Sequence, residues 1–225
     1  EKREFADRKT SKTIDGENKT GWFTEDFTLA ELKTLRAKER LPQLRRDNMA
    51  FDGQFEIPSL DELLAAEFAN GQHLILEVKH GAYFASKGLP VAAIMARKLA
   101  ESDWRERGIT LTIESFEFKM LEQLQRVCGP VGDFVYLVDT WSDPALNAKC
   151  AEVFDGISFN AELVWGGDLI ELAKARGLKV FVWTARAEDA ENTIEEYYAK
   201  FILSGADGIF ADQPDLLAAC VRDMS

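Results

Sequence analysis

Strand-like and helix-like segments alternate six times between residues 74 and 222 of this sequence. The expected strands are residues 74–79, 109–115, 134–139, 156–160, 179–184 and 207–211, and the expected helices are residues 89–102, 117–127, 144–152, 166–176, 187–204 and 214–222. Residues 178–183 are almost continuously apolar, which is typical of a parallel strand in a sheet that helices cover. The alternation therefore predicts an α/β fold with a parallel sheet, either a (β/α) barrel or an open doubly wound sheet.

The residues at the strand ends indicate which kind of site such a sheet would carry. No G-x-G-x-x-G or Walker sequence follows a strand, which argues against dinucleotide-binding and P-loop proteins. In a barrel, the active site lies at the carboxyl ends of the strands. Those ends here carry polar and aromatic residues, namely Glu77, Lys79, Glu114, Phe116, Asp139, Asn160, Trp183, Thr184 and Asp212. A closed barrel of this type needs eight strands, and only six are predicted.

The segment Leu74–His80 ends the first of these strands with charged residues. Because side chains alternate along a strand, Glu77 and Lys79 share one face and Val78 points to the other. Charged groups at the end of a buried strand are costly unless they are paired, hydrogen-bonded or bound to a metal. The segment alone leaves two interpretations open, a structural ion pair at the barrel rim or a functional pair.

The segment before residue 58 has little of the apolar periodicity that marks core helices and strands. Residues 1–27 are polar, and Asp15 and Gly16 mark a turn, so we expect an extended excursion without a core element. Capping boxes at Thr28 and Ser59 predict helices that end near residues 37 and 69, with a loop over residues 38–57.

Composition narrows the possible partners. The chain of 225 residues has 27 lysines and arginines against 39 acidic residues, a net charge of −12. Such a surface argues against binding nucleic acid or an anionic membrane surface. No apolar run approaches the roughly 20 residues of a membrane span. A small phosphorylated substrate is still compatible with this charge, because a metal ion inverts the local field inside a cleft.

The three cysteines are spaced too far apart for a zinc ribbon or a redox pair. Cys150 and Cys220 fall within predicted helices and are expected to be buried thiols.

Six motifs, in order along the chain, resemble those of the glycerophosphodiester phosphodiesterase family, in particular its bacterial and plant-like branch. The motifs are Phe5–Thr10 with Gly21–Leu35, Ile57–Leu63, Leu76–His80, Glu114–Phe116, Val182–Arg186 and Gly205–Asp212. The resemblance implies a TIM barrel that hydrolyses glycerophosphodiesters, which are small molecules, to glycerol 3-phosphate and an alcohol. It also implies a divalent cation, Ca²⁺ or Mg²⁺.

The same resemblance assigns roles to individual residues. Glu77 matches a metal-binding carboxylate of the family, and Lys79 matches a catalytic lysine near the substrate phosphate. Phe116 belongs to the family's serine–phenylalanine pair, and Trp183 most nearly matches the aromatic residue over the glycerol pocket. Arg186 is expected either to bind the phosphate or to cap the following helix.

The sequence also departs from the family's pattern. The family opens with a His-Arg-Gly strand, a Glu-x-Asp strand and a His-Asp loop, which supply two catalytic histidines and two further metal carboxylates. The only histidines here are His73, expected to have no function, and His80, for which fixing a loop is favoured over acid–base chemistry. We therefore expect an N-terminally truncated, incomplete barrel with six of the eight strands. Residues 58–225 would hold strands three to eight, and residues 1–57 would be the remnant of an insertion after the second strand.

Three acidic residues have weaker claims to the site. The family usually has a polar amide at the position of Glu114, and this extra acid either binds metal or faces solvent; we expect it to face solvent. Asp139 and Asp212 are candidates for the barrel rim, and Asp212 alternatively caps the last helix.

Two alternatives to the enzyme stay open at this point. One is a non-catalytic, phosphate-ligand-binding half-barrel, and the other is an inactive fragment. For the enzyme and for both alternatives, we expect the sheet to be open between the strands near residues 74–79 and 207–211.

Overall fold

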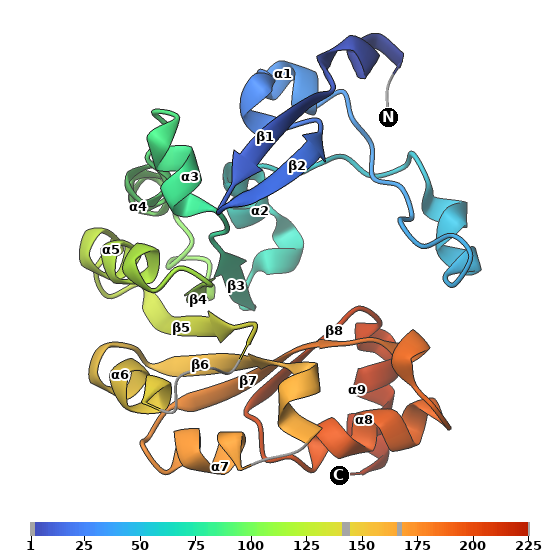
Figure 1. Ribbon diagram of the computed structural model, residues 1–225, viewed down its shortest axis with the longest axis vertical. Coiled ribbons are helices and arrows are strands. Elements are labelled where there is room, and N and C mark those ends of the chain that lie inside the picture. Colours follow the sequence, from blue (N-terminus) through green and yellow to red (C-terminus); the bar gives the residue numbers. More distant parts are fainter. Residues whose placement is uncertain (1–2, 141–144, 166–167, 225) are drawn as a thin grey trace.

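The fold is built on one parallel sheet of six strands, which the computed structural model shows together with its helices (Figure 1). The structure describes residues 3–140, 145–165 and 168–224. The strands are β3 (His73–Glu77), β4 (Thr110–Ser115), β5 (Gly132–Val138), β6 (Gly156–Asn160), β7 (Lys179–Ala185) and β8 (Gly208–Ala211). Their spatial order is their chain order, from β3 to β8. This singly wound order confirms the incomplete barrel and excludes the doubly wound sheet.

The two edges of the sheet are β3 and β8, as predicted. Each of the five pairings joins consecutive strands and is parallel. Within the described residues β3 and β8 do not pair with each other, so the barrel stays open between them.

All six predicted helices occur, with shorter bounds at several ends. They are α4 (Val91–Glu101), α5 (Phe118–Cys128), α6 (Leu146–Val153), α7 (Leu169–Lys174), α8 (Ile194–Ile202) and α9 (Pro214–Asp223). The predicted starts at residues 144 and 166 lie outside the described residues. Helix α8 begins seven residues later than expected because Thr193 caps it, its hydroxyl accepting from the Glu196 N–H. A short 3₁₀ turn, η6 (Ala187–Asp189), precedes it.

One helix was not predicted. Helix α3 (Gly81–Ser86) follows β3 directly, and the Glu117 carboxylate accepts hydrogen bonds from the Gly81 and Ala82 N–H groups at its start. A cap supplied by a residue 36 positions away leaves no local sequence signal.

The core lies between the sheet and the helices. Alternate strand residues such as Ile113, Phe159 and Val182 are fully buried there against helical residues such as Leu121 and Phe201. The intervening strand positions face away from the helices, and we call this the inner face. Cys150 and Cys220 are buried free thiols, as predicted.

Residues 10–21 form a β-hairpin within the segment that we expected to be an extended excursion without a core element. Strand β1 (Thr10–Ile14) pairs antiparallel with β2 (Glu17–Gly21). Asp15 and Gly16 both have positive φ, 52° and 85°, as a two-residue hairpin turn of this kind requires. The hairpin was missed because both its faces are mostly polar, so its alternation has no hydrophobic signal.

Both predicted capping boxes are present. Thr28 caps α1 (Leu29–Leu32) and Ser59 caps α2 (Leu60–Ala65), each with the reciprocal glutamate bond. Both helices end about four residues earlier than expected, and a 3₁₀ turn, η4 (Glu67–Ala69), follows α2. None of the described helices is long and apolar enough to cross a membrane.

The segment before β3 is tied to both edges of the open sheet. On the β3 side, Lys12 bridges Glu25 and Asp26 at 2.7 and 2.6 Å, and the Tyr83 hydroxyl of α3 donates to Glu25. On the β8 side, the Arg45 guanidinium bonds to Glu188 and Asp212, which follow β7 and β8. This segment therefore reaches across the opening that two further strands would otherwise fill.

Gly132 at the start of β5 has no room for a side chain. A Cβ added there would lie 1.8 Å from the Leu111 carbonyl oxygen of β4, so Gly132→Ala must separate the two strands. We expect a loss of about 3 kcal/mol in the free energy of unfolding, measured by urea denaturation. Gly21→Ala is the matched control, because nothing lies within 4 Å of its added Cβ. Equal stability of the two variants would contradict the β4–β5 register.

Candidate active site

A cavity of about 760 Å³ opens at the carboxyl ends of the strands. The hairpin closes one side of it and the loops after β3, β4 and β5 close the others. Its lining residues are Asp15, Glu17, Lys19, Lys79, His80, Phe116, Glu117, Tyr136, Leu137, Val138, Asp139, Thr140, Leu146 and Trp183. The cavity thus lies where a (β/α) barrel places its active site.

Three of the predicted site residues, Lys79, Phe116 and Trp183, line this cavity, and Lys79 connects them to Glu77, which is not among the lining residues. The Lys79 Nζ lies 3.4 Å from Oε1 of Glu77 and 4.9 Å from the ring centroid of Phe116. The Phe116 ring packs edge to face on Trp183, with centroids 5.2 Å apart. Residues from β3, the β4–α5 loop and β7 therefore meet, although they are far apart in the sequence.

The Glu77–Lys79 pair contributes little to stability. Its side chains are 37% and 58% exposed, and ion pairs as exposed as this one contribute about 0–1 kcal/mol. Stability alone therefore does not explain two charges at this strand end, which favours the functional interpretation over the structural one.

Glu114 does not face solvent, so that prediction is wrong. Its side chain is on the inner face and the residue is only 5% exposed. The β3–β4 register makes Glu114 the Cα partner of Glu77, so the two carboxyl groups lie on the same face of neighbouring strands. Burial, followed by the charge of Glu77, raises the pKa of Glu114 to about 7. Its Oε2 atom is buried, and none of the residues that the structure describes forms a hydrogen bond with it.

The two histidines have structural partners. His80 has a left-handed backbone, with φ 57°, and its Nδ1 lies 2.5 Å from the Asp15 carboxylate of the hairpin. This contact agrees with the predicted loop-fixing role. His73 begins β3, at the opposite end of the strand from the cavity, and hydrogen-bonds the hydroxyls of Thr110 and Thr112.

Arg186 is not among the residues that line the cavity. Its Nε bonds to Asp212 at 3.2 Å, and Arg45 shares the same Asp212 oxygen at 2.5 Å. Within the described residues, the Arg186 side chain makes no capping hydrogen bond to the 3₁₀ turn η6 that follows it, and the residue is not part of the lining of the carboxyl-end cavity. Asp212 thus forms ion pairs with both Arg45 and Arg186. The N-cap position of α9 is occupied by Gln213 and not by Asp212.

Asp139 does lie at the cavity. One of its carboxylate oxygens accepts a hydrogen bond from Asn160 Nδ2 at 3.4 Å, which joins the ends of β5 and β6.

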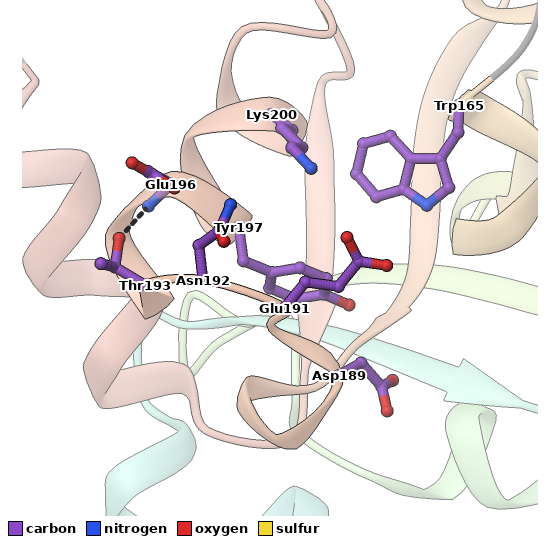
Figure 2. A pocket seen from close by; sticks show the side chains of 8 residues that line it. All are labelled: Trp165, Asp189, Glu191, Asn192, Thr193, Glu196, Tyr197 and Lys200. Atoms are coloured by element: carbon purple, nitrogen blue, oxygen red, sulfur yellow. Dashed lines mark hydrogen bonds between the residues drawn. The ribbon is translucent and has the colours of Figure 1, made fainter.

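A second pocket, of about 330 Å³, lies beside the start of α8 (Figure 2). Its lining residues are Trp165, Asp189, Glu191, Asn192, Thr193, Glu196, Tyr197 and Lys200. Lys200 lies over the Trp165 ring, 5.7 Å from its centroid. None of the residues that the sequence predicts for the site lines this pocket, so the larger cavity is the candidate active site.

The oxygen ligands expected for a hard cation are only partly present. Among the described residues, no group of three or more His, Cys, Asp or Glu side chains is placed to hold a metal ion. Glu77 and the unpartnered Glu114 form a neighbouring pair, and carboxylate oxygens are the ligands that Ca²⁺ and Mg²⁺ prefer. The two carboxylates are thus chemically suited to such a cation, and further oxygen ligands would have to complete its coordination shell.

The singly wound half-barrel, with a lysine and aromatic rings lining the cavity at its carboxyl end, defines the class as an incomplete α/β barrel. Residues 5–216 match the sequence profile of the glycerophosphoryl diester phosphodiesterase family, and the chain belongs to this family.

Curated proteins with similar sequences include the following two. A glycerophosphodiester phosphodiesterase of Caldanaerobacter subterraneus subsp. tengcongensis is 28% identical over 221 residues, which cover 96% of this chain and 78% of that protein. A glycerophosphodiester phosphodiesterase of Arabidopsis thaliana is 51% identical over 63 residues. That match covers 28% of this chain and only 16% of the plant protein.

Solved structures agree on the fold. A phosphodiesterase of Oleispira antarctica, in complex with the product sn-glycerol-3-phosphate, has a TM-score of 0.67 at 21% identity, covering 94% of this chain and 75% of that one. A glycerophosphodiester phosphodiesterase of Parabacteroides distasonis has a TM-score of 0.63 at 19% identity, covering 88% and 71%. At these identities the likeness establishes the barrel fold alone.

Ser115 fixes the geometry between the two loops that carry Lys79 and Phe116. Its fully buried hydroxyl donates to the Val78 carbonyl at 2.7 Å and accepts from the Glu117 N–H at 3.2 Å. We expect Ser115→Ala to lower the free energy of unfolding by about 1–3 kcal/mol, because it leaves buried backbone groups unsatisfied.

The control for this variant is Ser11→Ala in the exposed hairpin, where Thr20 is the only hydrogen-bond partner of the Ser11 hydroxyl in the described part of the chain. We expect a change within about 0.5 kcal/mol there. Chemical denaturation of both variants measures the difference, and a Ser115→Ala protein as stable as the control would show that the hydroxyl does not hold the two loops together.

Proposed function

We propose that this site acts on glycerophosphodiesters, in a divalent-cation-dependent hydrolysis that yields glycerol 3-phosphate and an alcohol. The observation that carries the proposal is the series of contacts from Glu77 through Lys79 and Phe116 to Trp183, of which the last three residues line the carboxyl-end cavity. Membership of the family supports the same reaction.

Lys79 is the phosphate-binding residue in this proposal. Its ammonium is more than half exposed at the cavity of a chain whose net charge is −12, so it offers a local positive site for an anionic group. As negative charge grows on the phosphoryl oxygens, an ammonium already in place stabilises it without reorganisation.

Glu77 would hold the cation, Ca²⁺ or Mg²⁺, with Glu114 beside it. When bound, such a cation polarises phosphoryl oxygens and helps to generate the nucleophile. The edge-to-face pair of Phe116 and Trp183 gives the glycerol backbone an apolar wall next to the charged groups. Arg186 is the weaker phosphate-binding candidate, because its Nε already bonds to Asp212 and the residue is not among those that line the cavity.

The two histidines do not form a pair for proton transfer within the part of the chain that the structure describes. His80 is bound to Asp15, and His73 is at the far end of β3. A histidine pair from His-Arg-Gly and His-Asp motifs would supply the acid and base. This observation favours one second candidate function, a phosphate-ligand-binding half-barrel that binds the product without turning the substrate over.

Binding of glycerol 3-phosphate tests the phosphate site without requiring catalysis. We expect the chain to bind it only with Mg²⁺ or Ca²⁺ present, by isothermal titration calorimetry. Lys79→Met should weaken binding by about tenfold or more, because it removes a charge-assisted hydrogen bond. Lys87→Met is the control, since Lys87 ends α3 outside the cavity lining. Equal affinities for both variants would remove Lys79 from the site.

Turnover separates the enzyme from the binding module. We expect the 225 residues alone to release no glycerol 3-phosphate from glycerophosphocholine. The same residues joined to an N-terminal segment with the His-Arg-Gly and Glu-x-Asp motifs should release it with Mg²⁺ or Ca²⁺. In that protein Glu77→Gln should lower kcat/KM by about a hundredfold or more, since it removes a charged ligand at constant volume. Full activity of Glu77→Gln across a titration of both cations would make Glu77 structural.

A further inference from the structure

Glu114 is a buried acid without a hydrogen-bonding partner for one of its oxygens. The residue is 5% exposed and its Oε2 has no partner among the described residues. A buried carboxylate in this state is costly unless it is neutralised or binds a cation. Glu114 is nevertheless an acid on a strand whose other inner-face residues, Thr110 and Thr112, carry neutral hydroxyl groups.

The geometry directs this carboxyl group toward Glu77. The two residues are Cα partners in the parallel pairing of β3 with β4, so their side chains leave the same face of the sheet. Neighbouring strands lie about 4.8 Å apart, and cation–oxygen distances are about 2.0–2.6 Å. One cation between the strands is therefore within reach of an oxygen from each side chain.

No basic side chain among the described residues takes that place. Lys79 pairs with Glu77, at 3.4 Å, and its ammonium also lies over the Phe116 ring. On the far side of β4, the position in register with Glu114 is Val135 of β5, which offers no donor.

We propose that Glu114 is a direct ligand of the divalent cation that Glu77 binds, so that the cation bridges β3 and β4. The inference rests on the proposed function, which places a cation at Glu77. A second carboxylate from β4 gives the site two charged ligands where an amide at this position would give one charged and one neutral ligand. The chain therefore has a cation site with more negative charge on these two strands than the family's usual pattern provides.

Direct binding of Mn²⁺ tests the proposal. Free Mn²⁺ measured by electron paramagnetic resonance gives the dissociation constant for the wild-type chain and for Glu114→Gln, Glu77→Gln and Glu17→Gln. Glu17 is the matched control, an acid that lines the same cavity from the hairpin with its side chain 75% exposed. We expect Glu114→Gln and Glu77→Gln each to weaken binding by about tenfold or more, and Glu17→Gln by less than twofold.

The temperature of thermal unfolding distinguishes a variant that has lost cation binding from one that folds poorly. In EDTA at pH 8, Glu114→Gln should unfold at the same temperature as the wild type or higher, because it removes a buried charge. Adding Mn²⁺ should raise the unfolding temperature of the wild type and of Glu17→Gln but leave Glu114→Gln almost unchanged.

The outcomes distinguish the two levels of the hypothesis. Loss of Mn²⁺ binding in Glu77→Gln with wild-type affinity in Glu114→Gln would overturn this inference and leave the proposed function standing. A wild-type chain that binds no Mn²⁺ would overturn both. A Glu114→Gln protein that unfolds well below the wild type in EDTA would assign the carboxyl group a structural role and also overturn the inference.

Discussion

The parallel, in-register pairing of consecutive strands is the constraint on which the rest of the structure depends. Because β3 to β8 pair in chain order, alternate residues of every strand meet on the inner face at matching heights. The helices bury the opposite face, which fixes the register, since a slip of one residue would exchange the two faces. The position of Glu114 beside Glu77, and of Lys79 and Phe116 just beyond them, follows from this pairing. The chemistry of the cavity is thus set by the same contacts that stabilise the sheet.

Much of this arrangement is predictable from the sequence because it depends on local and periodic signals. The apolar runs of the strands and the capping boxes at Thr28 and Ser59 are local features, and the structure confirms them. The grouping of Lys79, Phe116 and Trp183 follows from a barrel rule, that strand ends converge at one mouth. The bounds of the helices are less predictable, because caps such as Thr193 decide them residue by residue.

What the sequence did not predict depends on contacts between distant residues. Glu114 was expected in solvent, whereas it is buried on the inner face of β4, between the neighbouring strands β3 and β5. Arg186 has its own partner because Asp212, and Arg45 from a distant loop, form an ion-pair cluster that no short motif encodes. The polar hairpin lacks the hydrophobic alternation by which strands are recognised, and only the Asp15–Gly16 turn marks it.

The hairpin and the Arg45 loop also explain how an open sheet keeps the curvature that the cavity needs. In a closed barrel, strand pairing all the way around fixes the tilt of every strand. Here β3 and β8 lack that mutual pairing within the described residues, and side-chain bonds act at their carboxyl ends instead. His80 bonds to the hairpin directly, and Tyr83 is linked to it through Glu25, which also binds Lys12. Arg45 binds the residues that follow β7 and β8. These bonds lie at the rim and not along the strands, so they act at the end of the half-barrel where the cavity opens.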